Sequence, residues 1–327
     1  MITYGKYINP NIALDTRAEL VEKWPVPLIN EFDTNDPMKD EITRFTYTID
    51  SQYISPRMRN DQLKIVKETI GKFYNQKIFK KFCKCTGKNS KCSHPKDCEC
   101  SKNYKLSNIK GEEIILLRKQ RFDQPNRLLR ECTVQCNCDP YKCINRLVGN
   151  ASGVLQVKVR VERTEKMGWG LFADQDILEG QFIGNYSGEL CLFDSMKDMN
   201  VIDSYFFSVY PDINNFIKGN KNNSVKSLHI DARKYGNCTR FINHSCAPNL
   251  DAFHTMIFID YDDLENSNIP VISFFACKKI KKGEQFFVDY SESYWRVMND
   301  QGIFCYCGSK RCNFSEKSYN KKWNWDR

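Results

Sequence analysis

The sequence predicts a mainly β fold with short helices, flanked by two cysteine-rich modules. Between residues 151 and 290, apolar residues alternate with polar ones in short runs separated by glycines, which is typical of β-strands. Nine cysteines precede this region between residues 83 and 143, and three follow it between residues 305 and 312. The chain therefore has a β body with a cysteine-rich segment at each end.

Composition and length favour a soluble, intracellular protein. The 327 residues leave room for about two domains of ~100 to 200 residues each, and 41% of them are hydrophobic. The first twenty residues lack the apolar segment of a signal peptide, and the longest apolar run, Val271 to Cys277, is far shorter than the ~20 residues that span a bilayer. In a reducing compartment, we expect the 16 cysteines to bind metal rather than form disulfides.

The net charge of +9 is unevenly distributed. Residues 61–130 contain 18 lysines and arginines against 7 acidic residues, whereas residues 131–295 contain 17 against 21. The basic segment predicts contact with a polyanion such as DNA, and a solvated basic face is the alternative. The more acidic region could receive a basic peptide.

Residues 1–80 are predicted to form an N-terminal arm with a helix that leads into the first cysteine module. A short helix near Arg17 to Trp24 would stop at Pro25. From Asp61 to Phe82 the apolar residues approximate helical spacing with lysines between them, which predicts an amphipathic helix.

The nine cysteines of the first module fit a cluster of three zinc ions. Three bridging and six terminal thiolates would supply the twelve ligand positions of three tetrahedral zincs. Residues 101–131 would form a loop or helix excursion between the two halves of the cluster. The nine cysteines are Cys83, Cys85, Cys92, Cys98, Cys100, Cys132, Cys136, Cys138 and Cys143.

The β body contains seven predicted strands and one long loop. Residues 210–227 are polar and rich in asparagine, and we expect them to form a flexible loop. The predicted strands are residues 155–161, 181–189, 204–209, 228–232, 255–261, 271–277 and 285–290.

The stretch from Arg240 to Asn249 looks like a buried turn. It places two amides, His244 and Cys246 among apolar residues, and buried polar groups normally have a partner. A binding turn and an ordinary core turn, in which Asn243 and His244 satisfy backbone groups, both fit these ten residues.

The C-terminal cysteines favour the binding turn. Their Cys-x-Cys-x4-Cys spacing is one thiolate short of a tetrahedral structural zinc, and Cys246 could be the fourth ligand. The C-terminal cysteines are Cys305, Cys307 and Cys312.

Together these motifs resemble the SET-domain protein lysine methyltransferases. The resemblance is to the class with a nine-cysteine pre-SET and a Cys-x-Cys-x4-Cys post-SET, the Su(var) and euchromatic histone methyltransferase group that modifies histone H3 at lysine 9. The matching motifs, besides the cysteines, are Gly168-Trp169-Gly170, Asp203-Ser204-Tyr205, Ile230-Asp231-Ala232-Arg233, residues 240–249, and Gly283 to Tyr290 with Trp295.

The resemblance implies a fold and a domain order. The SET fold is a set of small curled β-sheets in which the C-terminal segment threads beneath a loop as a pseudoknot, so that residues 240–246 meet the strand ending at Tyr290. The implied domains are an N-terminal arm at 1–80, a pre-SET zinc cluster at 81–150, the SET domain at 151–292, a one-zinc post-SET at 301–317 and a tail at 318–327.

The resemblance also implies an S-adenosylmethionine-dependent enzyme. Tyr290 and Tyr205 would be catalytic, and Val288, Phe207 and Tyr290 would line the substrate channel. A free lysine of pKa ~10.4 is almost fully protonated near neutral pH, so a desolvated channel must lower the pKa of the lysine amine before methyl transfer. The implied cofactor-binding residues are Met167, Gly168, Trp169, Tyr205, Arg240, Asn243, His244 and Tyr306.

The substrate implied is the histone H3 tail in the nucleus, added as a strand between residues 191–201 and the post-SET segment. Val288 stands where the family usually has Phe or Tyr, which predicts a roomier channel and di- or trimethylation. The loop at 210–227 departs from the family by carrying fewer acidic residues. The alternatives are a catalytically inactive chromatin- or DNA-binding module and a methyltransferase for non-histone lysines.

Overall fold

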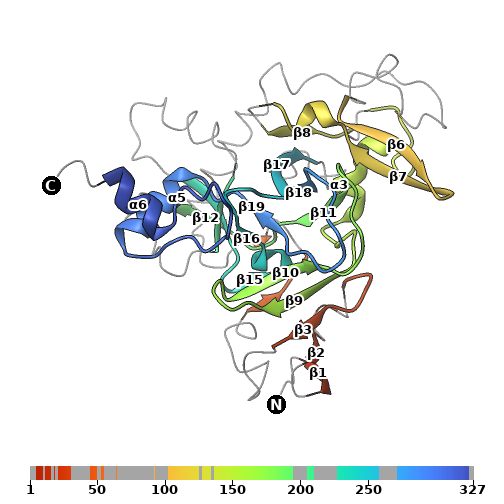
Figure 1. The fold of residues 1–327 in the computed structure, drawn as a ribbon. Coiled ribbons are helices and arrows are strands. Elements are labelled where there is room, and N and C mark those ends of the chain that lie inside the picture. The colour runs from red at the N-terminus through yellow and green to blue at the C-terminus, as the bar shows by residue number, and fades with distance from the viewer. Residues whose placement is uncertain are drawn as a thin grey trace.

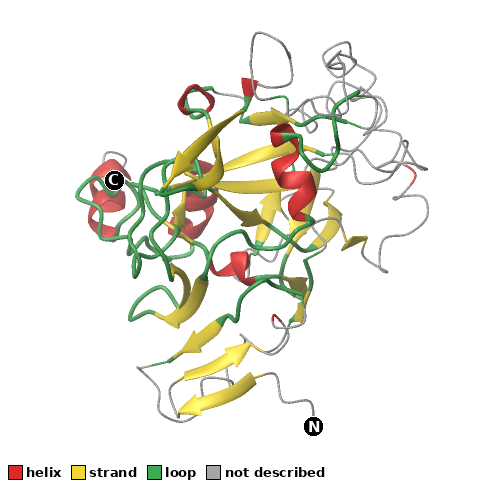
Figure 2. Ribbon diagram, turned by 90° about the vertical axis from the view of Figure 1, so that its right-hand side faces the viewer, coloured by secondary structure: helices red, strands yellow, loops and turns green. Residues whose placement is uncertain are grey.

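Small β-sheets joined by long loops dominate the structure, which confirms the predicted mainly β fold (Figure 2). None of the helices in the described part of the chain is long and apolar enough to cross a membrane. The computed structural model describes residues 5–9, 12–15, 18, 21–30, 45–49, 53–54, 64, 92, 102–124, 127–133, 136–193, 205–209, 227–257 and 271–323.

The first sheet joins the N-terminal segment to the body of the protein. Val159 and Val161 of β9 are buried while Arg160 between them is half-buried, the alternation expected of a strand with one face on the core. Strand β3 adds parallel to β9 with Leu28 opposite Val161, at the lower end of Figure 1. In spatial order the strands are β1 (Gly5–Asn9), β2 (Ile12–Asp15), β3 (Pro27–Ile29), β9 (Val159–Arg163) and β10 (Trp169–Ala173).

The second sheet has a strand buried on both faces. Every residue of β18 is buried. Ile272 and Phe274 pack in the main core, whereas Val271 and Phe275 pack in a second core with Tyr104. This double burial explains the continuous apolar run in the sequence. The strand order is β11 (Phe182–Asn185), β18 (Val271–Ala276), β17 (Leu250–Met256) and β8 (Leu128–Arg130).

The third sheet and two short strand pairs complete the body. β4 (Thr46–Tyr47) pairs with β15 (Tyr235–Gly236), and β16 (Asn243–His244) pairs with β19 (Phe287–Val288), both in parallel. The third sheet has the order β13 (Phe206–Ser208), β14 (Ser227–Asp231), β12 (Glu189–Phe193) and β5 (Tyr53–Ile54).

The pairing of β16 with β19 is the predicted meeting of the 240–246 stretch with the strand that ends at Tyr290. Asn249 stabilises this pair, which we call the β16–β19 crossing. Its side-chain oxygen accepts a hydrogen bond from the Phe287 amide at 2.7 Å, and its side-chain nitrogen donates to the Gln285 carbonyl at 2.8 Å. A buried amide that satisfies both of its ends in this way holds one segment against the other.

Residues 104–117 form a β-hairpin, so the predicted loop or helix excursion is wrong there. β6 (Tyr104–Ile109) and β7 (Glu112–Leu117) are joined by Lys110 and Gly111, which both have positive φ angles of 53° and 88°. Two positive φ angles are required by the type I′ turn, and the β-branched Ile114 and Ile115 favour a strand. The charge of this segment conceals its strand pattern.

Other boundaries also differ from the prediction. Strands β10 and β12 were not predicted, and β17 begins at Leu250 rather than at residue 255. In the predicted Arg17–Trp24 helix, the amides of Val21 and Glu22 both donate to the Ala18 carbonyl. The predicted helix at 61–82 and loop at 210–227 fall almost wholly outside the described residues. The helices with bounds in the described part of the chain are η4 (Lys119–Arg121), η5 (Ile144–Arg146), α3 (Leu147–Ala151), η8 (Cys238–Phe241), α5 (Glu292–Asp300) and α6 (Glu316–Trp323).

Candidate active site

A cavity of about 470 Å³ lies where β13, β19 and the start of α5 come together. It contains all three predicted channel residues, Val288, Phe207 and Tyr290, together with Tyr205 and Arg240. Sequence reasoning did not identify the other aromatic and apolar residues of its wall, which come from β13, β18, α5 and two loops that are far apart in the chain. They include Tyr186, Phe206, Ile242, Phe274 and Tyr294.

Tyr290 enters this cavity as a neutral hydroxyl. Its hydroxyl donates to the Ile242 carbonyl at 2.7 Å. Burial raises the pKa of Tyr290 well above its ordinary value, and the neighbouring tyrosines, Tyr294 first, add to the effect. The group therefore stays protonated at neutral pH, and it can orient a ligand but cannot act as a base.

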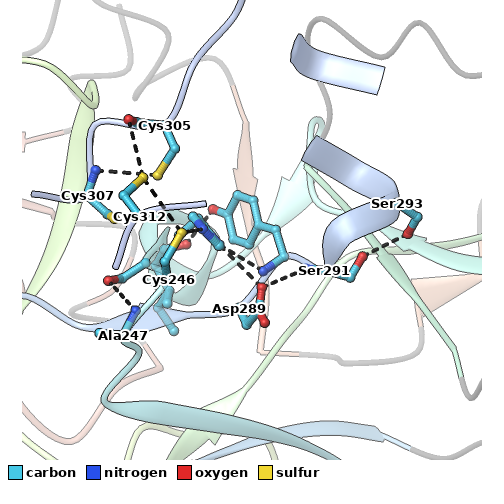
Figure 3. Close-up of polar contacts among 12 residues, drawn as sticks. Cys246, Ala247, Asp289, Ser291, Ser293, Cys305, Cys307 and Cys312 are labelled. Carbon is cyan, nitrogen blue, oxygen red and sulfur yellow. Dashed lines mark hydrogen bonds and ion pairs between the residues drawn. The ribbon is translucent and has the colours of Figure 1, made fainter. Parts of the chain in front are cut away.

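His244 connects Tyr290 to Cys246, whose sulfur is joined to that of Cys312 by a dashed line in Figure 3. Its Nδ1 accepts a hydrogen bond from the Tyr290 amide at 3.1 Å, and its Nε2 lies 3.4 Å from the Cys246 sulfur. Burial lowers the pKa of His244 to about 4, although the Asp289 carboxylate opposes this shift. In the neutral ring an acceptor at Nδ1 puts the proton on Nε2, so the ring donates toward the Cys246 sulfur.

Four cysteines form a group suited to one metal ion, as the sequence predicted. Their sulfur atoms lie within 4.8 Å of one another, and the sulfurs of Cys246 and Cys312 are 3.8 Å apart. Zn–S bonds of about 2.3 Å in a tetrahedron place the sulfurs about 3.8 Å apart, so the observed spacing fits zinc. Trp295 and Phe314 stack at 5.8 Å beside this group and hold α5 against the C-terminal loop. The group comprises Cys246, Cys305, Cys307 and Cys312.

A second group of four buried cysteines could also hold a metal. The sulfurs of Cys132 and Cys92 are 3.9 Å apart, and Cys136 packs in the same buried cluster. The group comprises Cys92, Cys132, Cys138 and Cys143. Of the nine predicted ligands, the remaining four lie outside the described residues: Cys83, Cys85, Cys98 and Cys100.

The predicted cofactor-binding residues fall into three places. Tyr205 and Arg240 line the cavity. The Met167–Trp169 turn lies beside β16, because the Asn243 side chain donates to the Trp169 carbonyl at 3.0 Å. Tyr306 is 57% exposed and lies outside the set of residues that line the cavity.

The Met167–Trp169 turn presents open space next to the crossing. The Thr164 hydroxyl donates to the Gly168 carbonyl at 2.8 Å and accepts from the Met167 amide at 2.9 Å. Gly168 has a φ of 69°, a conformation that favours glycine. Apart from its two chain neighbours, no described residue has an atom within 4 Å of the position its Cβ would take. A tight turn with free space and fixed backbone polar groups could accommodate a bound small molecule.

Two protein-family models match this sequence. A family model described as SET domain matches residues 168–291, and one described as Pre-SET motif matches residues 18–146. The chain therefore contains a SET domain and a Pre-SET motif. This finding confirms the resemblance deduced from the cysteine spacing and the 240–249 stretch, whereas the predicted domain boundaries remain predictions.

The SET-domain relatives are histone-lysine N-methyltransferases. The chain is 39% identical over 188 residues to mouse histone-lysine N-methyltransferase EHMT1, covering 58% of this chain and 13% of the mouse protein. It is 30% identical over 237 residues to the Arabidopsis thaliana H3 lysine-9 specific SUVH5, covering 71% of this chain and 26% of the relative. It thus spans a minor part of each of these relatives.

A solved structure supports the same fold. Arabidopsis thaliana SUVH6 in complex with SAM has a TM-score of 0.56 and 27% identity, covering 91% of this chain and 54% of that one. The described sheets therefore form a SET fold.

Proposed function

We propose that this chain is an S-adenosylmethionine-dependent lysine N-methyltransferase that acts on the histone H3 tail. The observation that carries the proposal is the aromatic cavity at the β16–β19 crossing, with the neutral Tyr290 hydroxyl and Val288 in its wall. The names of the relatives EHMT1 and SUVH5 support this substrate class.

The cavity suits a lysine amine that must lose its proton. Aromatic walls exclude water and disfavour the charged ammonium, which lowers the pKa of a bound lysine. Tyr290, as a neutral hydroxyl, would orient the amine and would take no proton from it. Tyr205 would line the same passage.

The proposed cofactor is held next to the crossing. Met167, Gly168, Trp169, Asn243 and His244 would bind S-adenosylmethionine, with Tyr205, Arg240 and Tyr306 beside it. The cofactor, when bound, supplies an electrophilic methyl group on a sulfonium. Asn243 holds the Trp169 carbonyl and thereby fixes the shape of this site.

Zinc would occupy both cysteine modules. The group that contains Cys246 would hold one zinc, and the nine pre-SET cysteines would hold three. The spacing of the described sulfur atoms supports the chemistry of the ligands in both groups.

Lysine 9 is the proposed target within the H3 tail, and the proposed products are di- and trimethyllysine. Val288 is 4% exposed and forms part of the cavity wall, where its small side chain leaves space for additional methyl groups. Such a protein would act on nucleosomes in the nucleus and contribute to chromatin silencing. Basic residues within 61–130, half of which lie outside the described residues, would contact DNA.

A methylation assay on an array of histone tail peptides with labelled S-adenosylmethionine tests the proposal. The expected result is transfer to H3 peptides that contain lysine 9, with dimethyl or trimethyl products by mass spectrometry. Transfer to none of the histone peptides, with transfer to other proteins in a nuclear extract, would point to a non-histone substrate. Absence of all methyl transfer would support the alternative of a catalytically inactive chromatin- or DNA-binding module.

A further inference from the structure

The Arg240 side chain, in the wall of the cavity, lies against two aromatic rings from different parts of the chain. Its guanidinium carbon is 3.8 Å from the centre of the Tyr205 ring and 4.4 Å from the centre of the Phe45 ring. Arg240 is 6% exposed, and its Nε donates to the Ala232 carbonyl at 2.9 Å. A desolvated guanidinium over aromatic faces is held by electrostatic attraction as well as by packing.

Phe45 comes from the N-terminal segment, in which the sequence analysis identified no candidate functional residue. It is 3% exposed and meets the Phe241 ring edge-on at 6.0 Å. The segment that follows it is fixed by two backbone hydrogen bonds, from the Thr46 amide to the Lys234 carbonyl at 2.6 Å and from the Thr48 amide to the Gly236 carbonyl at 2.7 Å.

Tyr47 and Glu22 anchor this segment to the body of the protein. The Tyr47 hydroxyl donates to one oxygen of the Glu22 carboxylate at 2.8 Å. The Leu155 amide donates to the other oxygen, also at 2.8 Å. Phe45 is therefore held in place by a parallel strand pair and by a carboxylate that bridges two parts of the chain.

Tyr205 and Arg240 share a backbone anchor. The amide of Ala232 donates to the Tyr205 carbonyl at 3.0 Å, while the Ala232 carbonyl accepts from Arg240. The Tyr186 hydroxyl donates to the same Tyr205 carbonyl at 2.6 Å. A movement of the Arg240 guanidinium would therefore displace the Tyr205 ring, which is part of the cavity wall.

We propose that Phe45 is a positioning residue for the cavity: its ring holds the Arg240 guanidinium against Tyr205 and so sets the shape of the wall that receives the substrate lysine. The inference rests on the proposed function for its kinetic consequence, but the contact itself can be tested without activity. It assigns the support of the active-site wall to a residue that lies outside the SET match at 168–291 and inside the Pre-SET match at 18–146.

The test compares Phe45→Leu, which removes the ring, with Phe45→Tyr, which keeps it. Val26→Ala is the matched control, because Val26 is 1% exposed in the same core and the same N-terminal segment. Three quantities are measured on the full chain: the melting temperature, the kcat and KM for peptide methylation, and the NMR position of the Arg240 Nε–Hε signal. Arg240→Lys assigns that signal.

Phe45→Leu is expected to move the Arg240 signal away from its ring-shifted position and to lower kcat/KM by about 5- to 30-fold, the range for one buried cation–π contact. Phe45→Tyr should preserve both the signal and the rate. Val26→Ala should lower the melting temperature and leave the Arg240 signal in place.

An unmoved Arg240 signal in Phe45→Leu would overturn the inference, as would equal kinetic losses in Phe45→Leu and Val26→Ala at matched loss of melting temperature. If the wild-type chain transfers no methyl group at all, the proposed function fails. The Arg240 signal would still decide whether Phe45 holds the guanidinium.

Discussion

Replacement of Cys312 by serine tests the coupling between the post-SET metal group and the cavity. Structural zinc contributes about 10 to 16 kcal/mol in small peptides, so one thiolate of four accounts for about 2.5 to 4 kcal/mol. Cys312→Ser should therefore weaken zinc binding on the order of 100- to 1000-fold. Within this metal group, Cys246 is linked to the Tyr290 amide through His244 alone, by contacts of 3.4 Å and 3.1 Å. We expect methyl transfer to be lost with the zinc.

The assay measures the zinc content of the purified protein by elemental mass spectrometry and methyl transfer to an H3 peptide. Cys312→Ser should lose one zinc per chain and leave the zinc of the pre-SET cysteines in place. Cys277→Ser is the control, because Cys277 is a half-buried cysteine outside both metal groups and its sulfur lies near the Pro248 carbonyl. Full activity in Cys312→Ser after loss of the zinc would refute the coupling.

Substitutions at Val288 and Ser291, with Ser293→Gly as a control, test the wall and the edge of the cavity. Val288→Phe should fill space beside Tyr290 and shift the product toward monomethyllysine by mass spectrometry, whereas an unchanged product distribution would contradict the role of this position. Ser291 has a φ of 80° and a ψ of 159°, a conformation that essentially only glycine adopts freely, and its side chain makes no capping bond to a backbone amide of α5. Ser291→Gly should raise the free energy of unfolding by about 1 kcal/mol in a denaturant titration. Ser293→Gly, which removes the partner hydroxyl at 2.8 Å within the first turn of α5, should lower it by about 0.5 to 1 kcal/mol. A destabilised Ser291→Gly would contradict the proposed strain at this position.

The cysteine sites were the features most readily predicted from the sequence. Thiolate chemistry and the count of four ligands led from Cys305, Cys307 and Cys312 to Cys246, and the structure brings these sulfurs together. Ligand number is a local chemical constraint that does not depend on how the intervening chain folds.

The residues of the cavity wall were harder to predict from the sequence. Its predicted residues, such as Tyr290 and Val288, came from the family resemblance. The additional residues Tyr186, directly after β11, and Phe274, in β18, look like ordinary core residues. Spacing along the chain does not indicate which core residues face a cavity.

The role of the N-terminal segment could not be read from its sequence. Thr46 and Tyr47 pair with Tyr235 and Gly236, almost 190 residues further along the chain. A two-residue strand in a parallel pair leaves no periodic pattern, and the contact of Phe45 with Arg240 depends wholly on that pairing.

The most direct test of the central claim is methyl transfer by Tyr290→Phe. Loss of the hydroxyl that donates to the Ile242 carbonyl should lower kcat on the order of 100-fold or more at an unchanged melting temperature within a few degrees. Tyr141→Phe, at a side chain that is 91% exposed, provides the matched control and should retain wild-type activity. Wild-type methyl transfer by Tyr290→Phe would contradict the assignment of this cavity as the active site.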